Sequence, residues 1–493
     1  MYSRLLFRKY LFAAAACTAC KPVASKSLPP KRFASRAGSS KIFMPLCEPM
    51  VRVGFTITFL LFFFSADAYA YDVTRSPDFW ISRLDNPDAV LMDDFRIKMF
   101  NEEIIASIDQ MADVSRMGET IAGDIIKGYI LEDPLPKDKA MFDRNGRKVR
   151  EAFYRQVEKN FNLDGVGNEV RVRFGVMVKR ADIRAFPTLD PLFKSAGSKG
   201  FDAVQYSSIY PPEVVALLHI SKDREWGFFQ TGFVRGWIRL DSVAFAEGRG
   251  MIDPYGAEGK EFLIVTGSFV NIYKDRELKK VIERLPMGAR LSISGEYKDR
   301  WGVAFPHRVK DGLLKWGSAY ISKKSDVSIR FLPYSKKNII RQAFKVLDEE
   351  YGWGGINRKR DCSLFIRDVF ATVGVNIPRN SRQQAVVGSV LVNTGSSGSA
   401  EEIKSVIGSS APGITLLAMD GHIMLYLGNI EERHYVIHSV YRYEDVEGIK
   451  VVNKTTVTDL NTGSGTKNGA IMDRIKGVTL LIPNGYISEA SRP

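Results

Sequence analysis

Residues 361–370 read DCSLFIRDVF, and this stretch decides how the last third of the chain folds. Apolar residues within it recur at helical spacing, so we predict a helix that begins at or just after Cys362. The positive end of the helix macrodipole and its free backbone N–H groups favour the thiolate form of a cysteine there. Cys362 is therefore a candidate nucleophile. A buried structural cysteine is the alternative interpretation.

The segments around this stretch have a mixed helix and strand pattern. Residues 338–350 form an amphipathic stretch for which we predict a helix, and the loop YGWGG follows at 351–355. Beyond the predicted helix at Cys362, the segments 421–428 and 434–440 alternate as two strands around a turn at 429–431. The last domain is therefore predicted to be α+β.

Three of the five histidines, His422, His434 and His438, fall within seventeen residues. In a hairpin centred on residue 430, His422 and His438 lie directly opposite each other on one face, where one imidazole can orient the other. A register slip of one residue would place them on opposite faces. We interpret His434 as a surface residue. Zinc is the competing use of one Cys and two His, but zinc sites usually contain paired cysteines, so we predict no metal and no cofactor.

Two segments of short strands precede this domain and resemble each other. Trp226-Gly227 and Trp301-Gly302 begin equivalent strand patterns 75 residues apart, which predicts two tandem small barrels over 167–248 and 258–328. A glycine-rich link, 248–259, joins them. We interpret the tryptophans as barrel core rather than as binding residues.

The region before the barrels has a helical pattern. Apolar residues at three and four spacing between 91 and 131 and an amphipathic stretch over 147–161 predict a helical domain, 71–166, packed as a bundle. The apolar positions in the first stretch are Phe95, Met99, Ile104, Ile105, Ile108 and Met111.

Residues 1–70 have the composition of a leader. An apolar run at 55–64 precedes an Ala-Tyr-Ala cleavage site, so we predict an export signal over 50–70. We interpret residues 1–49 as lying upstream of the true start; a lipid anchor through Cys17 or Cys20 is the alternative. Past residue 70 no apolar run reaches membrane-spanning length. We therefore expect an exported protein of the periplasm, cell envelope or medium, without stable membrane insertion.

The net charge of +14 is concentrated in the leader, where ten Lys and Arg face two acidic residues. The remaining 423 residues hold 60 Lys and Arg against 54 Asp and Glu. This surplus of six is weak evidence for nucleic-acid binding, and we expect no nucleic-acid partner.

The ordered motifs resemble the NlpC family of papain-like cell-wall cysteine peptidases. They are the loop at 351–355, Asp361-Cys362-Ser363, Ile377-Pro378-Arg379-Asn380-Ser381 with Gln384, Gly421-His422, and His438. The direct resemblance covers 335–485, and helices followed by two SH3-like barrels resemble a multidomain branch of that family. The fold class implied is multidomain α+β, with a papain-like domain over 333–493.

The family cleaves peptidoglycan stem peptides, typically between γ-linked D-glutamate and a diamino acid. The resemblance implies that Cys362 is the nucleophile, His422 the general base and His438 the residue that orients it. Tyr351 is an oxyanion candidate beside the Cys362 amide. The substrate-binding candidates by resemblance are Asp361, Ser363, Arg379 and Trp353. For three of these, the alternative readings are helix cap (Asp361), helix-start hydroxyl (Ser363) and surface charge (Arg379).

Leu364 departs from the family pattern, which commonly has Gly after Asp-Cys-Ser, and its larger side chain is expected to narrow the pocket. The barrels are expected to restrict entry to released muropeptides, and we expect a monomer. Two other functions stay open. One is a papain-like acyltransferase or amidase on lipids or other amides, and the other is a wall-binding protein with an inactive peptidase domain.

Overall fold

The computed structural model describes residues 72–198, 200–252, 261–394 and 399–484. The predicted leader, 1–70, and most of the predicted link, 248–259, lie outside the described residues. Within the described part, no helix combines the length and apolar character needed to cross a membrane.

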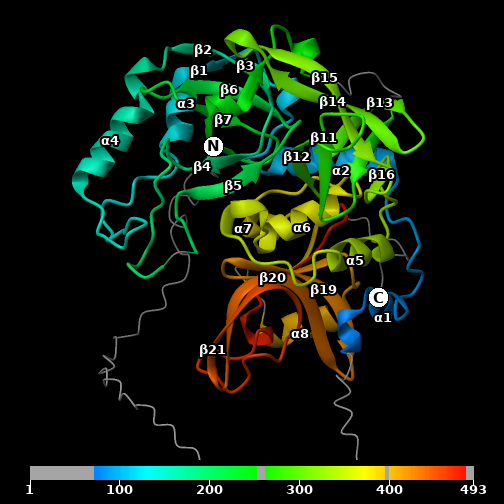
Figure 1. Cartoon of the computed structure of the whole chain (residues 1–493). Helices are drawn as coiled ribbons and strands as arrows, with labels where there is room; N and C mark the ends of the chain where they lie inside the picture. The colour runs from blue at the N-terminus through cyan, green and yellow to red at the C-terminus, as the bar shows by residue number, and fades with distance from the viewer. Residues whose placement is uncertain (1–71, 199, 253–260, 395–398, 485–493) are drawn as a thin grey trace, which may run out of the picture. The chain divides into compact units, whose positions relative to one another are not determined.

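The C-terminal region contains a six-stranded antiparallel sheet with the order β17-β22-β18-β19-β20-β21 (Figure 1). Its strands are β17 (Ser389–Asn393), β18 (Thr415–Met419), β19 (His422–Ile430), β20 (Arg433–Asp445), β21 (Gly448–Asp459) and β22 (Gly477–Leu480). Its helices are α5 (Lys336–Phe344), α6 (Cys362–Ala371), α7 (Ser381–Gln384) and α8 (Ala400–Gly408). The predicted papain-like α+β arrangement is confirmed, because α6 packs against β19 and β20.

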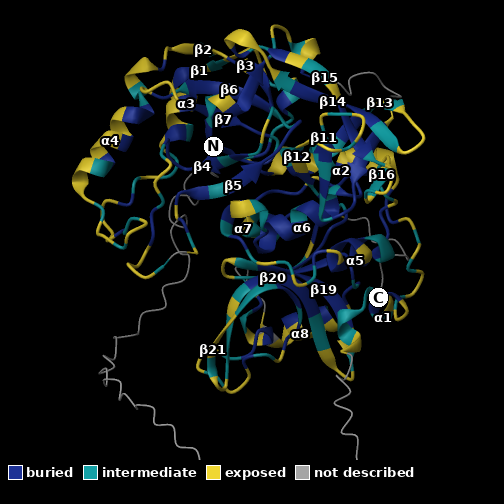
Figure 2. Ribbon diagram, in the orientation of Figure 1, coloured by how far each residue is buried: buried dark blue, intermediate teal, exposed yellow. Residues whose placement is uncertain are grey.

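Helix α6 is buried along most of its length, as Figure 2 shows. Its apolar side chains belong to a core formed with α5 and the central strands of the sheet. The preceding helix is shorter than predicted. Helix α5 ends at Phe344 rather than Glu350, and Asp348 has a φ of 66°, which a continuing helix excludes.

The two barrels repeat one topology. The first sheet has the order β5-β4-β8-β7-β6-β3-β9, and the second has β12-β11-β15-β14-β13-β10-β16, so each strand is replaced by the one seven places later. The first sheet contains β3 (Arg173–Met177), β4 (Ala181–Arg184), β5 (Gln205–Ile209), β6 (Val214–Ile220), β7 (Trp226–Gln230), β8 (Arg235–Arg239) and β9 (Val243–Phe245). The second contains β10 (Phe262–Val265), β11 (Phe269–Tyr273), β12 (Val281–Pro286), β13 (Arg290–Glu296), β14 (Arg300–Arg308), β15 (Leu314–Ser322) and β16 (Val327–Ile329). The predicted tandem repeat is confirmed by this order.

The tryptophans are mostly core, as predicted. Trp226 and Trp237 are buried in the first barrel, and Trp301 packs against the core of the second. Trp316 differs, because it packs against the core of the first barrel and its Nε1 donates to the Met251 carbonyl at 2.7 Å. It therefore joins the two barrels.

The predicted helices before the barrels are present, but the predicted bundle is wrong. The elements are α1 (Pro77–Ile81), α2 (Asp94–Ser107), β1 (Thr120–Ala122), α3 (Gly123–Ile130), α4 (Glu151–Phe161) and β2 (Glu169–Arg171). Residues 80–111 pack into the core of the C-terminal domain, whereas 114–161 pack into the core of the first barrel. Two of the periodic positions, Phe95 and Met99, are exposed. Three others, Ile104, Ile108 and Met111, are buried as predicted, and the first turns of α2 bury Ile97 and Phe100 instead.

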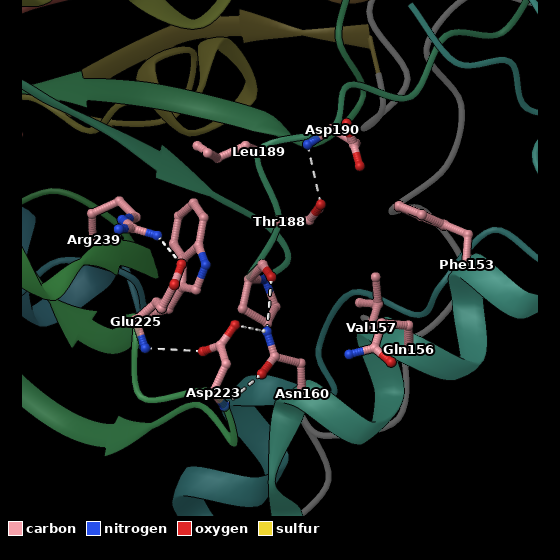
Figure 3. A pocket seen from close by; sticks show the side chains of 12 residues that line it. Phe153, Gln156, Val157, Asn160, Thr188, Leu189, Asp190, Asp223, Glu225 and Arg239 are labelled. Atoms are coloured by element: carbon pink, nitrogen blue, oxygen red, sulfur yellow. Dashed lines mark hydrogen bonds and ion pairs between the residues drawn. The ribbon is translucent and has the colours of Figure 1, made fainter.

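Helix α4 is tied to the first barrel through Asn160, whose side chain faces Asp223 in Figure 3. Its Nδ2 donates to Asp223 at 2.9 Å and to the Pro187 carbonyl at 3.1 Å, and its Oδ1 accepts the Asp223 amide at 3.1 Å. A hollow of about 260 Å³ lies beside these contacts. None of the predicted site residues lines it.

We expect Trp80→Ala to lower the free energy of unfolding by about 3–5 kcal/mol, because the side chain is 1% exposed inside the C-terminal core. Phe95→Ala is the matched control from the same segment; at 71% exposure it should change stability by less than about 0.5 kcal/mol. Urea denaturation monitored by circular dichroism measures both. If the two variants lowered the free energy of unfolding equally, Trp80 would not belong to the C-terminal core.

Candidate active site

Cys362 is the first residue of α6, as predicted, and is buried. Asp361 caps the helix, because its carboxylate accepts the Leu364 amide at 2.9 Å. The backbone amides of Ser363 and Ile423 approach the Cys362 sulfur and act to lower its pKa. Since Ile423 follows His422 on β19, this contact brings the start of that strand to the thiol.

His422 and His438 are hydrogen-bonded to each other, with 2.7 Å between His422 Nε2 and His438 Nδ1. The predicted shared face is therefore present. The predicted turn and register are wrong, however, because Leu425 pairs with Ile437 and a bulge between Tyr426 and Gly428 moves the turn to residues 431–432. Extending that register makes the two histidines diagonal neighbours rather than directly opposite ones.

The remaining nitrogen of the buried His438, Nε2, lies 2.9 Å from the Thr458 hydroxyl on β21. Thr458 is buried too, so the three side chains form one chain of hydrogen bonds across three strands. His434 takes no part in this chain; its Nδ1 lies 2.9 Å from the Tyr426 hydroxyl.

Burial opposes the thiolate that the helix start was expected to favour. It raises the pKa of the Cys362 thiol to about 12, and the neighbouring charge of Asp361 acts in the same direction. Burial also lowers the pKa of His422 to about 4, with a further contribution from the positive charge of Arg474. At neutral pH these shifts favour the thiol form of Cys362 and the neutral form of His422.

Asp361, Ser363 and Arg379 form one buried network. Arg379 donates to Asp361 at 2.5 Å and to the Ser363 hydroxyl at 2.7 Å. Its Nε donates to Ser207 of the first barrel at 2.8 Å. With 6% exposure, Arg379 is not the surface charge offered as the alternative reading.

The 351–355 loop is pressed against strand β5 of the first barrel. A Cβ on Gly354 would lie 2.4 Å from Gln205 Cγ, and one on Gly355 would lie 2.3 Å from Ser208 Oγ. Both glycines also have positive φ. Gln205 Nε2 donates to the Gly354 carbonyl at 3.0 Å. These two glycines allow the close approach of the barrel.

The aromatic residues of this loop meet the first barrel and β20. Trp353 Nε1 donates to the Asp202 carbonyl at 2.9 Å, and its ring packs against Phe201 at 5.3 Å. Tyr351 packs against Phe201 and Tyr441. Burial raises the pKa of Tyr351, and the charges of Cys362 and Asp361 add to this shift, so its hydroxyl stays protonated.

Leu364, the departure from the family pattern, is buried against the same loop. A Cβ on Gly355 would lie 3.1 Å from Leu364 Cδ2. Its expected narrowing of the pocket stays a prediction. Among the described residues, no group of three His, Cys, Asp or Glu is arranged to hold a metal ion.

Sequence reasoning missed Thr458, Ser207 and Arg360. The buried Arg360 donates to Asp368 of α6 at 2.8 Å and to the Ser268 carbonyl of the second barrel at 2.8 Å. Each of these residues acts across a long sequence separation. Only Arg360 had a local sequence signal for a role in the site, because it directly precedes Asp361 at the helix start.

Two family models match the chain. Residues 348–461 match the NlpC/P60 family, and residues 191–239 match the SH3 domain of the SH3b1 type. The second match lies within the predicted first barrel. A comparison with curated proteins found no match.

Several solved structures are similar. An NlpC/P60 endopeptidase from Photobacterium damselae subsp. piscicida aligns with a TM-score of 0.62 at 18% identity, covering 82% of this chain and 97% of that one. An NlpC/P60 family protein from Bacillus cereus ATCC 10987 aligns with a TM-score of 0.44 at 14% identity, covering 63% of this chain and 100% of that one. The peptidoglycan hydrolase RipB from Mycobacterium tuberculosis aligns with a TM-score of 0.20 at 23% identity, covering 30% of this chain and 64% of that one. The first alignment establishes a shared multidomain fold.

We expect the alkylation of Cys362 by iodoacetamide to accelerate about tenfold per pH unit from about pH 7 to about pH 9, because the raised pKa keeps the thiolate fraction small. Mass spectrometry of the peptide that contains residue 362 measures the rate separately from the leader cysteines. A rate that is already constant above about pH 5 would instead indicate a resting thiolate–imidazolium pair.

Proposed function

This chain contains an NlpC/P60 cysteine-peptidase domain behind an SH3 domain of the SH3b1 type, and from this premise we propose that it hydrolyses peptidoglycan stem peptides. The bond we propose is the one between γ-linked D-glutamate and a diamino acid. The observation that carries the proposal is a cysteine at the start of a buried helix, beside the strand that begins with a hydrogen-bonded histidine. The name of one similar structure, an NlpC/P60 endopeptidase, supports it.

We assign the reaction to Cys362, His422 and His438. The thiol proton passes to His422 Nδ1 as the sulfur attacks the carbonyl carbon, and the leaving amine takes that proton when the C–N bond breaks. Water, deprotonated by the same nitrogen, then hydrolyses the thioester. The lowered pKa of His422 keeps the imidazole neutral and free to accept a proton at neutral pH, and it also makes this nitrogen a weaker base than an ordinary histidine.

The chain of hydrogen bonds sets the tautomers that this reaction requires. Nδ1 of His422 is free to accept a proton only if its Nε2–H donates to His438 Nδ1, which lies at 2.7 Å. His438 must then carry its own proton on Nε2 and donate it to the Thr458 hydroxyl at 2.9 Å. Thr458 is therefore a positioning residue.

The remaining site residues are assigned to binding. The protonated hydroxyl of Tyr351 and the Cys362 amide are the proposed oxyanion donors. Asp361, Ser363, Arg379 and Trp353 are the proposed contacts for the charged ends of the peptide. Asp361 and Arg379 already bond each other and their neighbours. The substrate can therefore contact only the lone pairs and N–H groups that these hydrogen bonds leave unused.

The contact between β5 and the 351–355 loop supports a restricted entrance. Gln205 of the first barrel approaches Gly354, and Phe201 packs against Tyr351 and Trp353. We therefore propose that the substrates are released muropeptides rather than the intact wall, and that the protein works as an exported monomer in the periplasm, cell envelope or medium.

We expect the purified protein to split L-Ala-γ-D-Glu-diaminopimelate into L-Ala-D-Glu and free diaminopimelate, as measured by mass spectrometry. Cys362→Ala should abolish the product, because the attacking sulfur is lost. His434→Ala is the matched control among the neighbouring histidines and should retain activity, since its Nδ1 hydrogen-bonds Tyr426 and not the His422–His438 pair.

Two outcomes would replace this proposal. If the unmodified protein does not cut the peptide although iodoacetamide still alkylates its Cys362 thiol, the proposal is replaced by an acyltransferase or amidase that acts on other substrates. If the thiol does not react at any pH and the protein still binds isolated walls, an inactive wall-binding protein does.

We expect Thr458→Val to lower kcat about tenfold with KM unchanged, because the buried Nε2–H of His438 loses its acceptor. Thr458→Ser keeps a hydroxyl and should restore most of the rate. Steady-state kinetics on the same peptide, with thermal melts to verify folding, measures the effect. Equal loss in both variants would show that the hydroxyl does not act through His438.

A further inference from the structure

The second barrel touches the helix that carries the nucleophile. Its turn between β12 and β13 contains Met287 and Gly288, and Met287 is buried in the core of the C-terminal domain. Gly288 has a φ of 82°, and a Cβ on it would lie 2.5 Å from the Cβ of Ala371 in α6. A side chain at this position would collide with the helix. The barrel therefore packs directly against the last turn of α6.

One buried side chain joins the same barrel to the other end of the helix. Arg360 lies two residues before Cys362 and is 3% exposed. Its Nη1 donates to the Ser268 hydroxyl at 2.9 Å and its Nη2 to the Ser268 carbonyl at 2.8 Å, in the turn between β10 and β11. The Ser268 carbonyl also accepts the Met287 amide at 3.0 Å. These two turns of the barrel are therefore tied to each other where they meet the C-terminal domain.

Two carboxylates of the C-terminal domain bind the same guanidinium. Arg360 Nε donates to Asp368 of α6 at 2.8 Å, and Nη1 donates to Glu349 at 2.8 Å. The backbone of Glu349 in turn accepts the Thr455 amide of β21 at 2.8 Å. Counting Ser268, four hydrogen bonds leave one planar group, so the side chain cannot turn without breaking several of them. Arg360 is thus fixed from three directions.

The backbone of Arg360 is the point where three parts of the candidate site meet. Its carbonyl accepts the amide of Gly352, in the loop of the oxyanion candidate, at 2.9 Å. The same carbonyl accepts the hydroxyl of Ser439 at 2.9 Å, and this fully buried serine follows His438 on β20. The chain itself reaches Cys362 two residues later. A shift of Arg360 would therefore move the thiol, the imidazole pair and the oxyanion donor relative to one another.

We propose that Arg360 is a positioning residue for the reaction and that the second barrel acts on the site through it. Ser268 holds the guanidinium, and the guanidinium holds the start of α6, the strand of His438 and the 351–355 loop in their relative places. A displacement of about 1 Å between reacting groups can cost about a hundredfold in rate. The second barrel then belongs to the catalytic unit. The effect on turnover rests on the proposed hydrolysis, whereas the effect on the thiol does not.

The test compares Arg360→Gln with the parent in two assays on the full chain, well below the melting temperature of either. In steady-state kinetics on the stem peptide we expect kcat to fall about tenfold or more with KM within about twofold, because misplacement acts on the transition state. Alkylation of Cys362 by iodoacetamide at about pH 8 should instead become about threefold faster, since a loosened helix start uncovers a thiol that is 6% exposed. A merely structural role would lower the melting temperature and move neither assay.

Ser268→Ala tests the barrel directly and removes only one hydroxyl, leaving the carbonyl contact in place. We expect kcat to fall about threefold. Combined with Arg360→Gln it should cause no further loss, because both changes act through one contact. Lys345→Gln is the matched control. This lysine also joins the C-terminal domain to the second barrel, through Asp326 at 2.6 Å and the Thr266 carbonyl at 3.1 Å, and its loss should leave both assays at the parental level.

Three results would overturn the proposal. They are parental values of kcat and of the alkylation rate in the folded Arg360→Gln and Ser268→Ala proteins, independent effects of the two changes in the double variant, and an equal loss in Lys345→Gln and Ser268→Ala. If Arg360→Gln does not fold, the comparison of Ser268→Ala with Lys345→Gln decides. If the parent does not cut the stem peptide, the proposed hydrolysis fails, and the alkylation rates alone decide whether Arg360 holds the thiol in place.

Discussion

The buried ion pair between Asp361 and Arg379 holds the catalytic helix and the first barrel in one arrangement. The carboxylate also accepts the amides of Leu364 and Gly354, and the guanidinium also donates to Ser207. Two charges removed from water are tolerated only when their remaining hydrogen-bonding positions are filled, so these contacts depend on one another. The position of Cys362 is consequently fixed by residues from the helix start, the glycine loop and the barrel together.

Much of the candidate site could be predicted because its signals are local. Helical spacing after Cys362 placed the thiol at the start of α6, and alternation around residue 430 placed His422 and His438 on one face. The register was missed because a single-residue bulge carries no clear signature in composition. Thr458 was missed because it joins the site only through the pairing of β20 with β21.

The fold of the barrels followed from their repeat, whereas the helices before them did not follow from periodicity. A helical stripe shows that one face is buried but does not say against what. Trp80 and the residues of α2 find their partners in the C-terminal core, more than two hundred residues later, whereas Asn160 of α4 finds Asp223. Which distant segments come together is decided by tertiary packing, and a short stretch of sequence carries no information about it. The shift in the thiol pKa differs in direction from the expectation for a related reason, because the helix terminus is readable in the sequence and the burial of Cys362 is not.

The split of the N-terminal helices between two cores also sets an order of assembly. Residues 80–111 leave the ribosome long before β22, yet β22 contributes to the core that receives them. Both barrels are complete before that strand exists, so they are able to fold as units during synthesis while the first helices wait. The catalytic core closes around Trp80 only after β22 has been made. A chain that stops before β22 therefore lacks part of the core that supports the active site.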